Sequence, residues 1–259
     1  MTNWIFLRGL MRDSRHWGDF PAVFRREHAA SERLNIVLID LPGNGSLNRM
    51  QSPSDVHSMV EHCRRELAAR HIQPPYTLLA MSLGAMATVA WAERYPQELA
   101  ACVLINTSLH PFSPFHQRLR PENYPSILKL ALLGGSDAAW ESHILHMTSN
   151  LASERERLVA RWSEWRRQFP VARANALRQL WAASRYRAPL QNPPPPMLIL
   201  AAAADRLVSP DCSRRLAAHW RTDFAEHPTA GHDLPLDDGP WVAQHVRRWL
   251  QRSCNNRPR

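Results

Sequence analysis

The sequence predicts an α/β fold built on a mostly parallel sheet of about six strands flanked by helices. Short apolar runs alternate with longer segments of helical periodicity, and parallel strands require such helical crossovers. The length of 259 residues and the hydrophobic fraction of 44% are sufficient for one such domain with a large core. The strand candidates lie at residues 4–8, 35–39, 76–80, 101–106, 197–203 and 222–227.

Helix candidates fill the segments between these strands. In residues 55–70 the apolar side chains recur on one face, and residues 83–94 follow the third strand candidate directly. A last helix candidate, residues 240–251, carries apolar residues at helical spacing and should pack on the sheet.

A long segment between the fourth and fifth strand candidates lacks strand signals and exceeds the length of an ordinary loop. It must therefore form its own structure. Its apolar residues space as three helix faces, and the second helix is opened by a capping box of Ser153 and Glu156 and closed by Pro170. The three faces are Trp140, Ile144, Met147 and Leu151; Leu158, Trp162, Trp165 and Phe169; and Leu177, Leu180 and Trp181.

Ser82 is the best candidate for a nucleophile. It lies in Ala80-Met81-Ser82-Leu83-Gly84, between a strand candidate and a helix candidate. This is a near match to G-x-S-x-G, in which a sharp turn lifts the serine hydroxyl above the sheet. Small residues are needed on both sides because the strand and helix backbones nearly touch. Taken alone, the motif also fits ordinary turn chemistry.

Candidate partners for Ser82 occur far downstream, each at a loop position after a strand candidate. They are Asp205 and His232. Separately, Asp205 could cap the following helix and His232 could be one of thirteen ordinary histidines. In the chain order Ser, Asp, His, the three form a candidate catalytic triad. Three other acids follow the histidine rather than a strand and rank below Asp205: Asp233, Asp237 and Asp238.

Together with two further motifs, these residues resemble the α/β-hydrolase superfamily over nearly the whole chain. The motifs are Arg8-Gly9-Leu10 after the first strand and the turn Asp40-Leu41-Pro42-Gly43-Asn44-Gly45. The resemblance is greatest to small capped carboxylesterases, such as those that demethylate pimeloyl-carrier-protein esters. It implies hydrolysis of an ester or thioester through an acyl-serine intermediate, with the backbone N–H groups of Leu10 and Leu83 as the oxyanion hole.

The resemblance also implies a domain division. The long insertion corresponds to a helical cap at residues 109–189, placed after the fourth predicted strand. The α/β-hydrolase core would then comprise residues 1–108 and 190–254, with a disordered tail at residues 255–259.

Substrate contacts are predicted less directly. Arg8 stands where the family usually has histidine. Facing the pocket it would favour an anionic substrate, whereas turned away it would pin its loop through backbone carbonyls, and we favour the second interpretation. One face of the cap should line an apolar acyl pocket, although a tryptophan stripe more often forms cap core. The candidate contacts are Arg8, Met81, Trp140 and Trp162.

Charge is concentrated in the insertion. Residues 109–189 hold eleven arginines and Lys129 against six acids, which accounts for +6 of the net charge of +9. This excess could steer an acidic carrier protein or a free anionic ester, or it could reflect an arginine-rich composition alone. No nucleic-acid motif accompanies it, so no nucleic-acid partner is expected. A C–C hydrolase or lyase using the same triad, and a non-catalytic ligand-binding protein, are the alternatives to an esterase.

The chain carries no targeting or metal-binding signal. Its first strand candidate leaves no room for a signal peptide, and no apolar run is long enough to span a bilayer, so we expect a cytoplasmic protein without a membrane partner. The four cysteines lack C-x-x-C spacing and are expected to be reduced thiols. No cofactor is implied, and no feature indicates an oligomeric state. The cysteines are Cys63, Cys102, Cys212 and Cys254.

Overall fold

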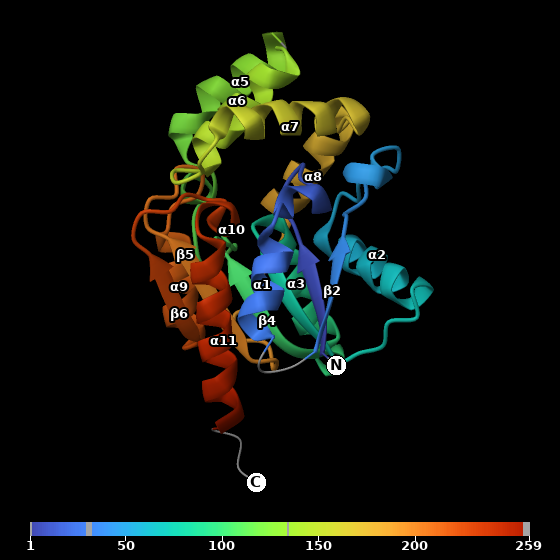
Figure 1. Cartoon of the computed structure of the whole chain (residues 1–259), viewed down its shortest axis with the longest axis vertical. Coiled ribbons are helices and arrows are strands. Elements are labelled where there is room, and N and C mark those ends of the chain that lie inside the picture. The colour runs from blue at the N-terminus through green and yellow to red at the C-terminus, as the bar shows by residue number, and fades with distance from the viewer. Residues whose placement is uncertain (1, 30–32, 134, 256–259) are drawn as a thin grey trace.

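The computed structural model describes residues 2–29, 33–133 and 135–255, which form one sheet with helices on both faces (Figure 1). Within these residues six strands follow the order β2-β1-β3-β4-β5-β6, and every neighbouring pair is parallel. The predicted sheet is confirmed. The strands are β1 Thr2–Leu7, β2 Leu34–Ile39, β3 Tyr76–Met81, β4 Leu99–Ile105, β5 Met197–Ala202 and β6 Asp223–His227.

Alternate residues of the central strands enter two separate cores. In β1, Ile5 and Leu7 join the apolar cluster that includes α2, α3 and α9, whereas Trp4 and Phe6 join the cluster that includes α1 and α11. A sheet covered on both faces requires such continuously apolar strands. The helices of the core are α1 Phe20–His28, α2 Val56–Ala69, α3 Leu83–Arg94, α9 Asp211–Trp220, α10 Leu234–Asp237 and α11 Gly239–Asn255. Short 3₁₀ turns are η1 Ser14–Trp17, η2 Gly45–Leu47, η3 Pro96–Glu98 and η4 Pro121–Asn123.

The segment between β4 and β5 is helical, as predicted, and we call its helices the insertion helices. Three of them, α5, α6 and α7, lie at the end of the molecule opposite the N-terminus of β1, which is the end where the parallel strands finish (Figure 1). The domain boundaries drawn from the sequence stay a prediction. The predicted tail falls largely on residues 256–259, outside the described residues, whereas Asn255 ends α11. The insertion helices are α4 Phe115–Arg118, α5 Tyr124–Leu133, α6 Asp137–Thr148, α7 Arg155–Gln168 and α8 Arg173–Arg185.

The predicted capping box at the start of α7 is wrong. The helix begins at Arg155, and its N-cap residue is Glu154, which has a left-handed backbone with φ 51° and makes no side-chain cap hydrogen bond. Ser153 therefore lies one residue too early for its hydroxyl to reach the free N–H groups of the first turn. The Glu154 carboxylate instead pairs with Arg157 at 2.8 Å.

The apolar face predicted for α8 is exposed rather than buried. Leu177 is 66% exposed and Trp181 is 54% exposed, while Gln179 is fully buried. The buried amides hydrogen-bond to the loop at residues 44–52, so that Asn175 donates to the Met50 carbonyl at 2.9 Å. Periodicity located the helix correctly but assigned its faces the wrong way round. On α6 the predicted face also ran too far, because the helix ends at Thr148 and Leu151 is 44% exposed.

Three of the four cysteines are described as free and buried thiols: Cys63, Cys102 and Cys212. Burial raises the pKa of Cys63 to about 12, so its thiol is protonated and unreactive at neutral pH. The side chain of Cys254, near the end of α11, lies outside the described part of the structure. Across the described part of the chain, no helix is both long enough and apolar enough to cross a membrane.

We predict that Gly84→Ala destabilises the protein by about 3 kcal/mol, because the new Cβ would lie 2.6 Å from the Leu7 carbonyl oxygen and 2.7 Å from that of Arg8. Backbone atoms at this distance cannot yield without moving β1 or α3. Gly239→Ala is the matched control, since its Cβ would meet side chains alone, the Phe20 ring at 3.1 Å and the Val23 Cγ1 at 3.9 Å. Urea unfolding of both variants tests this, and equal losses of unfolding free energy would contradict it.

Candidate active site

Ser82 occupies a strained turn between β3 and α3. Its backbone has φ 53° and ψ −118°, a conformation that L-residues rarely adopt and that costs about 1–3 kcal/mol. The turn lies at the switch point of the sheet, where β1 has β2 on one side and β3 on the other. Such switch points at the carboxyl ends of parallel strands are where α/β proteins bind ligands.

The loop after β1 runs directly against Ser82. A Cβ at Gly9 would lie 3.0 Å from the Ser82 Cβ and 3.5 Å from its Oγ, so a larger residue would require the two segments to move apart by a few tenths of an ångström. Leu10 follows in the same loop, and Leu83 is the first residue of α3, where backbone N–H groups point out of the helix end. The two predicted oxyanion donors therefore belong to the two segments that flank Ser82.

Asp205 and His232 form a buried hydrogen-bonded pair. The His232 Nδ1 and the Asp205 Oδ2 are 2.7 Å apart, and the two residues are 4% and 1% exposed. The other carboxylate oxygen, Oδ1, accepts the backbone N–H groups of Leu207 at 2.8 Å and Val208 at 2.9 Å. The carboxylate is thereby fixed in orientation, and its contact with Nδ1 favours the tautomer that leaves Nε2 free to accept a proton.

Asn106 is a residue of the candidate site that the sequence pattern did not indicate. It follows β4 directly beside Ser82, because Met81 and Ile105 are paired in the sheet. Its buried side chain donates to the His232 carbonyl at 2.7 Å and accepts from the Ala202 N–H at 2.9 Å. Asn106 therefore links the histidine loop to two strands. A polar residue directly after a buried strand is the signal that could have found it.

Arg8 forms a two-pronged ion pair with Asp233. The guanidinium Nη1 and Nη2 lie 3.0 Å and 2.5 Å from the two carboxylate oxygens, and both residues are buried. Burial raises the pKa of Asp233, whereas the charge and hydrogen bonds of Arg8 lower it. The lowering is the larger effect, so the pKa of Asp233 lies below its usual value. The guanidinium thus pairs with a carboxylate, not with the backbone carbonyls expected from the sequence. The ion pair joins the loop of Gly9 to the loop of His232.

The end of α6 is bound to the histidine loop. The Thr148 carbonyl accepts the Asp233 N–H at 2.6 Å, and a Cβ at Gly231 would lie 2.8 Å from the same oxygen. Asp237 accepts from the Gly231 N–H at 2.7 Å and from the Asn150 N–H at 2.9 Å. Asp233 and Asp237 therefore brace the loop, while Asp205 is the acid in contact with the imidazole.

A second charged cluster joins the loop after β1 to α6 and α7. Arg12 donates to Glu141 of α6 at 2.7 Å and lies over the Trp162 ring of α7, 4.5 Å from its centroid. His16 is buried, with its Nε2 2.9 Å from the Arg12 Nη1 and its Nδ1 3.3 Å from the Asp13 Oδ1. Burial and the charge of Arg12 lower the pKa of His16 to about 4, so its imidazole is neutral at pH 7.

The four predicted substrate contacts have other neighbours in the structure. Met81 is buried in the apolar cluster below α1 and α11. Trp162 is held by Arg12, Trp140 is half-buried under the guanidinium of Arg166 at 4.9 Å, and Arg8 is paired with Asp233. Their role in binding substrate stays a prediction.

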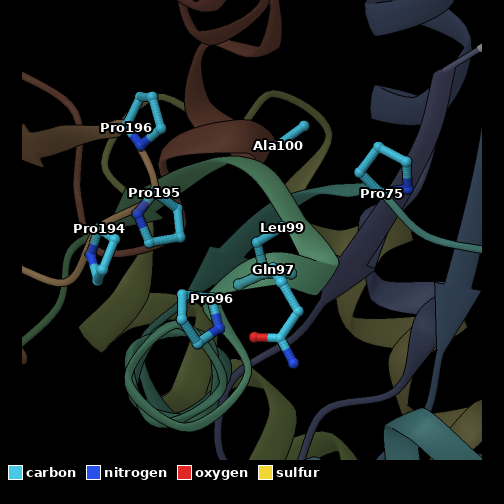
Figure 2. Close-up of a pocket in the computed structure, with 8 residues that line it drawn as sticks. All are labelled: Pro75, Pro96, Gln97, Leu99, Ala100, Pro194, Pro195 and Pro196. Carbon is cyan, nitrogen blue, oxygen red and sulfur yellow. The ribbon is translucent and has the colours of Figure 1, made fainter.

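Figure 2 shows a surface hollow lined by residues of three strand starts. It lies at the opposite end of the sheet from Ser82, which follows the end of β3. It is formed where β3, β4 and β5 begin, and its eight lining residues include no nucleophilic or titratable side chain. The hollow is therefore separate from the candidate site. It is lined by Pro75, Pro96, Gln97, Leu99, Ala100, Pro194, Pro195 and Pro196.

The chain belongs to the alpha/beta hydrolase family, whose model matches residues 4–245. A 104-residue segment is 31% identical to the biotin biosynthesis bifunctional protein BioHC of Teredinibacter turnerae, covering 40% of this chain and 17% of that protein. The chain thus spans 24% or less of the length of the curated relatives it matches.

Solved structures share the fold at low sequence identity. A thermophilic esterase from Thermogutta terrifontis superposes with a TM-score of 0.71 at 18% identity, over 97% of this chain and 90% of the esterase. A meta-cleavage product hydrolase from Pseudomonas fluorescens superposes with a TM-score of 0.76 at 17% identity, over 98% of this chain and 92% of the hydrolase. The family and the fold support a hydrolase.

We expect Arg8→Met and Asp233→Leu each to lower the unfolding free energy by about 3–5 kcal/mol, because each leaves a buried charge without its partner. The double variant Arg8→Met/Asp233→Leu should recover most of this loss. Urea unfolding of the four proteins at pH 7 measures the coupling between the two residues. Additive losses in the double variant would mean that the ion pair contributes nothing as a pair.

His16 should make stability fall in mild acid. Its pKa is about 4 in the folded protein and about 6.5 in the unfolded chain, so between these values only the unfolded chain binds the proton. Above pH 6.5 this residue has no effect, and at pH 5 it costs about 2 kcal/mol. The unfolding free energy of wild type should therefore drop more than that of His16→Gln between pH 7 and pH 5. Equal drops would refute a neutral buried His16.

Proposed function

We propose that this chain is a serine hydrolase that cleaves carboxylic esters or thioesters through an acyl-serine intermediate on Ser82. The observation that carries the proposal is the buried Asp205–His232 pair, whose Oδ2 and Nδ1 atoms are 2.7 Å apart. His232 lies on a loop that Asn106 ties to the strand end beside Ser82. A strained serine, an oriented imidazole and a buried carboxylate are the three parts that acyl transfer by this route requires.

Each residue has a distinct role in the proposed reaction. His232 takes the proton from Ser82 through Nε2 while the serine oxygen attacks the carbonyl carbon, and Asp205 stabilises the imidazolium. The N–H groups of Leu10 and Leu83 donate to the negative oxygen of the tetrahedral intermediate. His232 then gives its proton to the leaving alcohol or thiol. A water molecule, deprotonated by the same imidazole, attacks the acyl carbon; the bond to the Ser82 oxygen breaks, the acid leaves, and His232 returns the proton to Ser82.

We propose an anionic or carrier-bound acyl group as the substrate class. The excess of arginines in residues 109–189 supports this choice, since positive charge near a site raises the rate of encounter with anions. Part of that charge is neutralised locally, because Arg166 pairs with Asp137 at 3.0 Å and Arg157 with Glu154 at 2.8 Å. We also propose that the protein acts in the cytoplasm, which its buried free thiols support.

The proposed nucleophile can be tested by covalent labelling. A fluorophosphonate probe should label wild type at one site, and Ser82→Ala should abolish the labelling together with hydrolysis of p-nitrophenyl esters. Ser108→Ala is a matched control, because Ser108 is another buried serine in a segment that follows a strand, and it should keep both. Intact mass spectrometry and initial rates provide the readouts. Labelling that persists in Ser82→Ala would overturn the assignment.

The labelling result, combined with a substrate panel, distinguishes an esterase from a C–C hydrolase and from a non-catalytic binding protein. A panel of p-nitrophenyl esters of rising chain length, run beside an acyl-carrier-protein methyl ester, reports the preferred acyl group. Labelling without ester hydrolysis, combined with turnover of a vinylogous diketone, would favour the C–C hydrolase. Neither labelling nor turnover by wild type would favour a non-catalytic binding protein.

A further inference from the structure

Helix α8 is amphipathic, but its polar face is buried and its apolar face is exposed. Its buried face carries the polar residues Asn175 and Gln179, whereas Leu177, Leu180 and Trp181 are 66%, 37% and 54% exposed. We call these three exposed residues the α8 ridge. Their positions, separated by three and four residues, place them together on one side of the helix. A contiguous apolar surface that contains tryptophan is typical of an interaction site.

The polar face of α8 explains why the helix cannot turn the ridge inward. Gln179 accepts the Met11 N–H at 2.9 Å and donates to Asn44 at 2.8 Å and to the Ser52 hydroxyl at 3.0 Å. Asn175 accepts the Ser52 N–H at 2.9 Å. Rotating the helix would leave these buried groups without partners, at about 1–3 kcal/mol each. The exposure of the ridge is therefore built into the fold.

The surroundings of the ridge are basic. Residues 165–204 contain six arginines and no acid, and residues 41–54, whose loop packs against the buried face of α8, contain Arg49 and no acid. Arg173 and Arg185 are exposed on α8 itself, and the Arg185 guanidinium lies over the Trp181 ring at 5.1 Å. In the same loop Met50 is 45% exposed. At the end of the helix, burial and the charge of Glu93 raise the pKa of Tyr186, so an acid also lies near this end.

We propose that the α8 ridge docks on an anionic lipid surface. A helix presents a convex face, which fits a deformable membrane interface, and leucine and tryptophan bordered by arginines match the composition of interfacial helices. Anionic headgroups would pair with the arginines while the ridge enters the boundary of the acyl chains. The sequence-based expectation of no membrane partner rested on the lack of a spanning segment. Peripheral docking requires no such segment.

Docking would bring lipid close to the candidate site. The inner face of α8 contacts Met11, the residue after Leu10, so a surface on the outer face lies about one helix diameter, 10–12 Å, from the loop after β1. The proposal does not depend on the chemistry at Ser82, since docking is measured by binding alone.

Vesicle flotation tests the proposal. Wild type should float with phosphatidylcholine vesicles containing about 30% phosphatidylglycerol, float less with pure phosphatidylcholine, and lose binding as salt is raised. Leu177→Ser/Trp181→Ser and Arg173→Glu/Arg185→Glu should each weaken the binding about tenfold or more. Leu190→Ser is the matched control, because its side chain is 63% exposed outside the ridge, and it should bind like wild type.

Folding controls and alternative partners of the α8 ridge can be tested with the same variants. In the absence of vesicles, all variants should hydrolyse a soluble p-nitrophenyl ester at the wild-type rate, which would show that they are folded. If the wild-type chain has no esterase activity, circular dichroism provides the same control. No flotation of wild type, or flotation unchanged in both double variants, would overturn the proposal. Ridge-dependent dimerisation in sedimentation without flotation would assign the ridge to a second copy instead, and ridge-dependent retention on an immobilised acidic carrier protein would assign it to that partner.

Discussion

The close packing of α3 against the end of β1 is the constraint on which the candidate site depends. Because Gly84 has no side chain, the helix approaches the carbonyl groups of Leu7 and Arg8 to within van der Waals contact. That approach holds Ser82 at φ 53° and brings Gly9 against its side chain. The nucleophile candidate and one predicted oxyanion donor, Leu83, thereby lie where α3 packs against the end of β1.

Residues of the segment between β4 and β5 contact the other loops of the candidate site. Thr148 and Asn150 hold the histidine loop, Glu141 holds Arg12, and Gln179 holds the Met11 N–H. The loop after β1 therefore lies between two buried ion pairs, one to the histidine loop and one to α6. Such buried pairs add little net stability, but they define one arrangement, because every alternative leaves a charge unpaired.

The local parts of this structure were predictable from sequence, and the long-range polar contacts were not. All six strands end within two residues of their predicted positions, because apolar runs and the turns after them are local signals. Ser82, Asp205 and His232 could be predicted as a triad because each lies in a loop after a strand. The partner of Arg8 could not be found, since Asp233 lies 225 residues away in sequence. The prediction assigned the buried and exposed faces of α8 the wrong way round. The buried amides of α8 pair with a distant loop, and apolar periodicity carries no information about such partners.

A crystal structure of the protein inhibited by an alkyl phosphonate tests the proposed mechanism most directly, because the phosphonate mimics the tetrahedral intermediate. We predict phosphorus bonded to the Ser82 Oγ, the phosphoryl oxygen within hydrogen-bond distance of the Leu10 and Leu83 nitrogens, and the His232 Nε2 facing the Ser82 oxygen. Phosphorus bonded to any other residue, or a phosphoryl oxygen turned away from both amides, would contradict the mechanism.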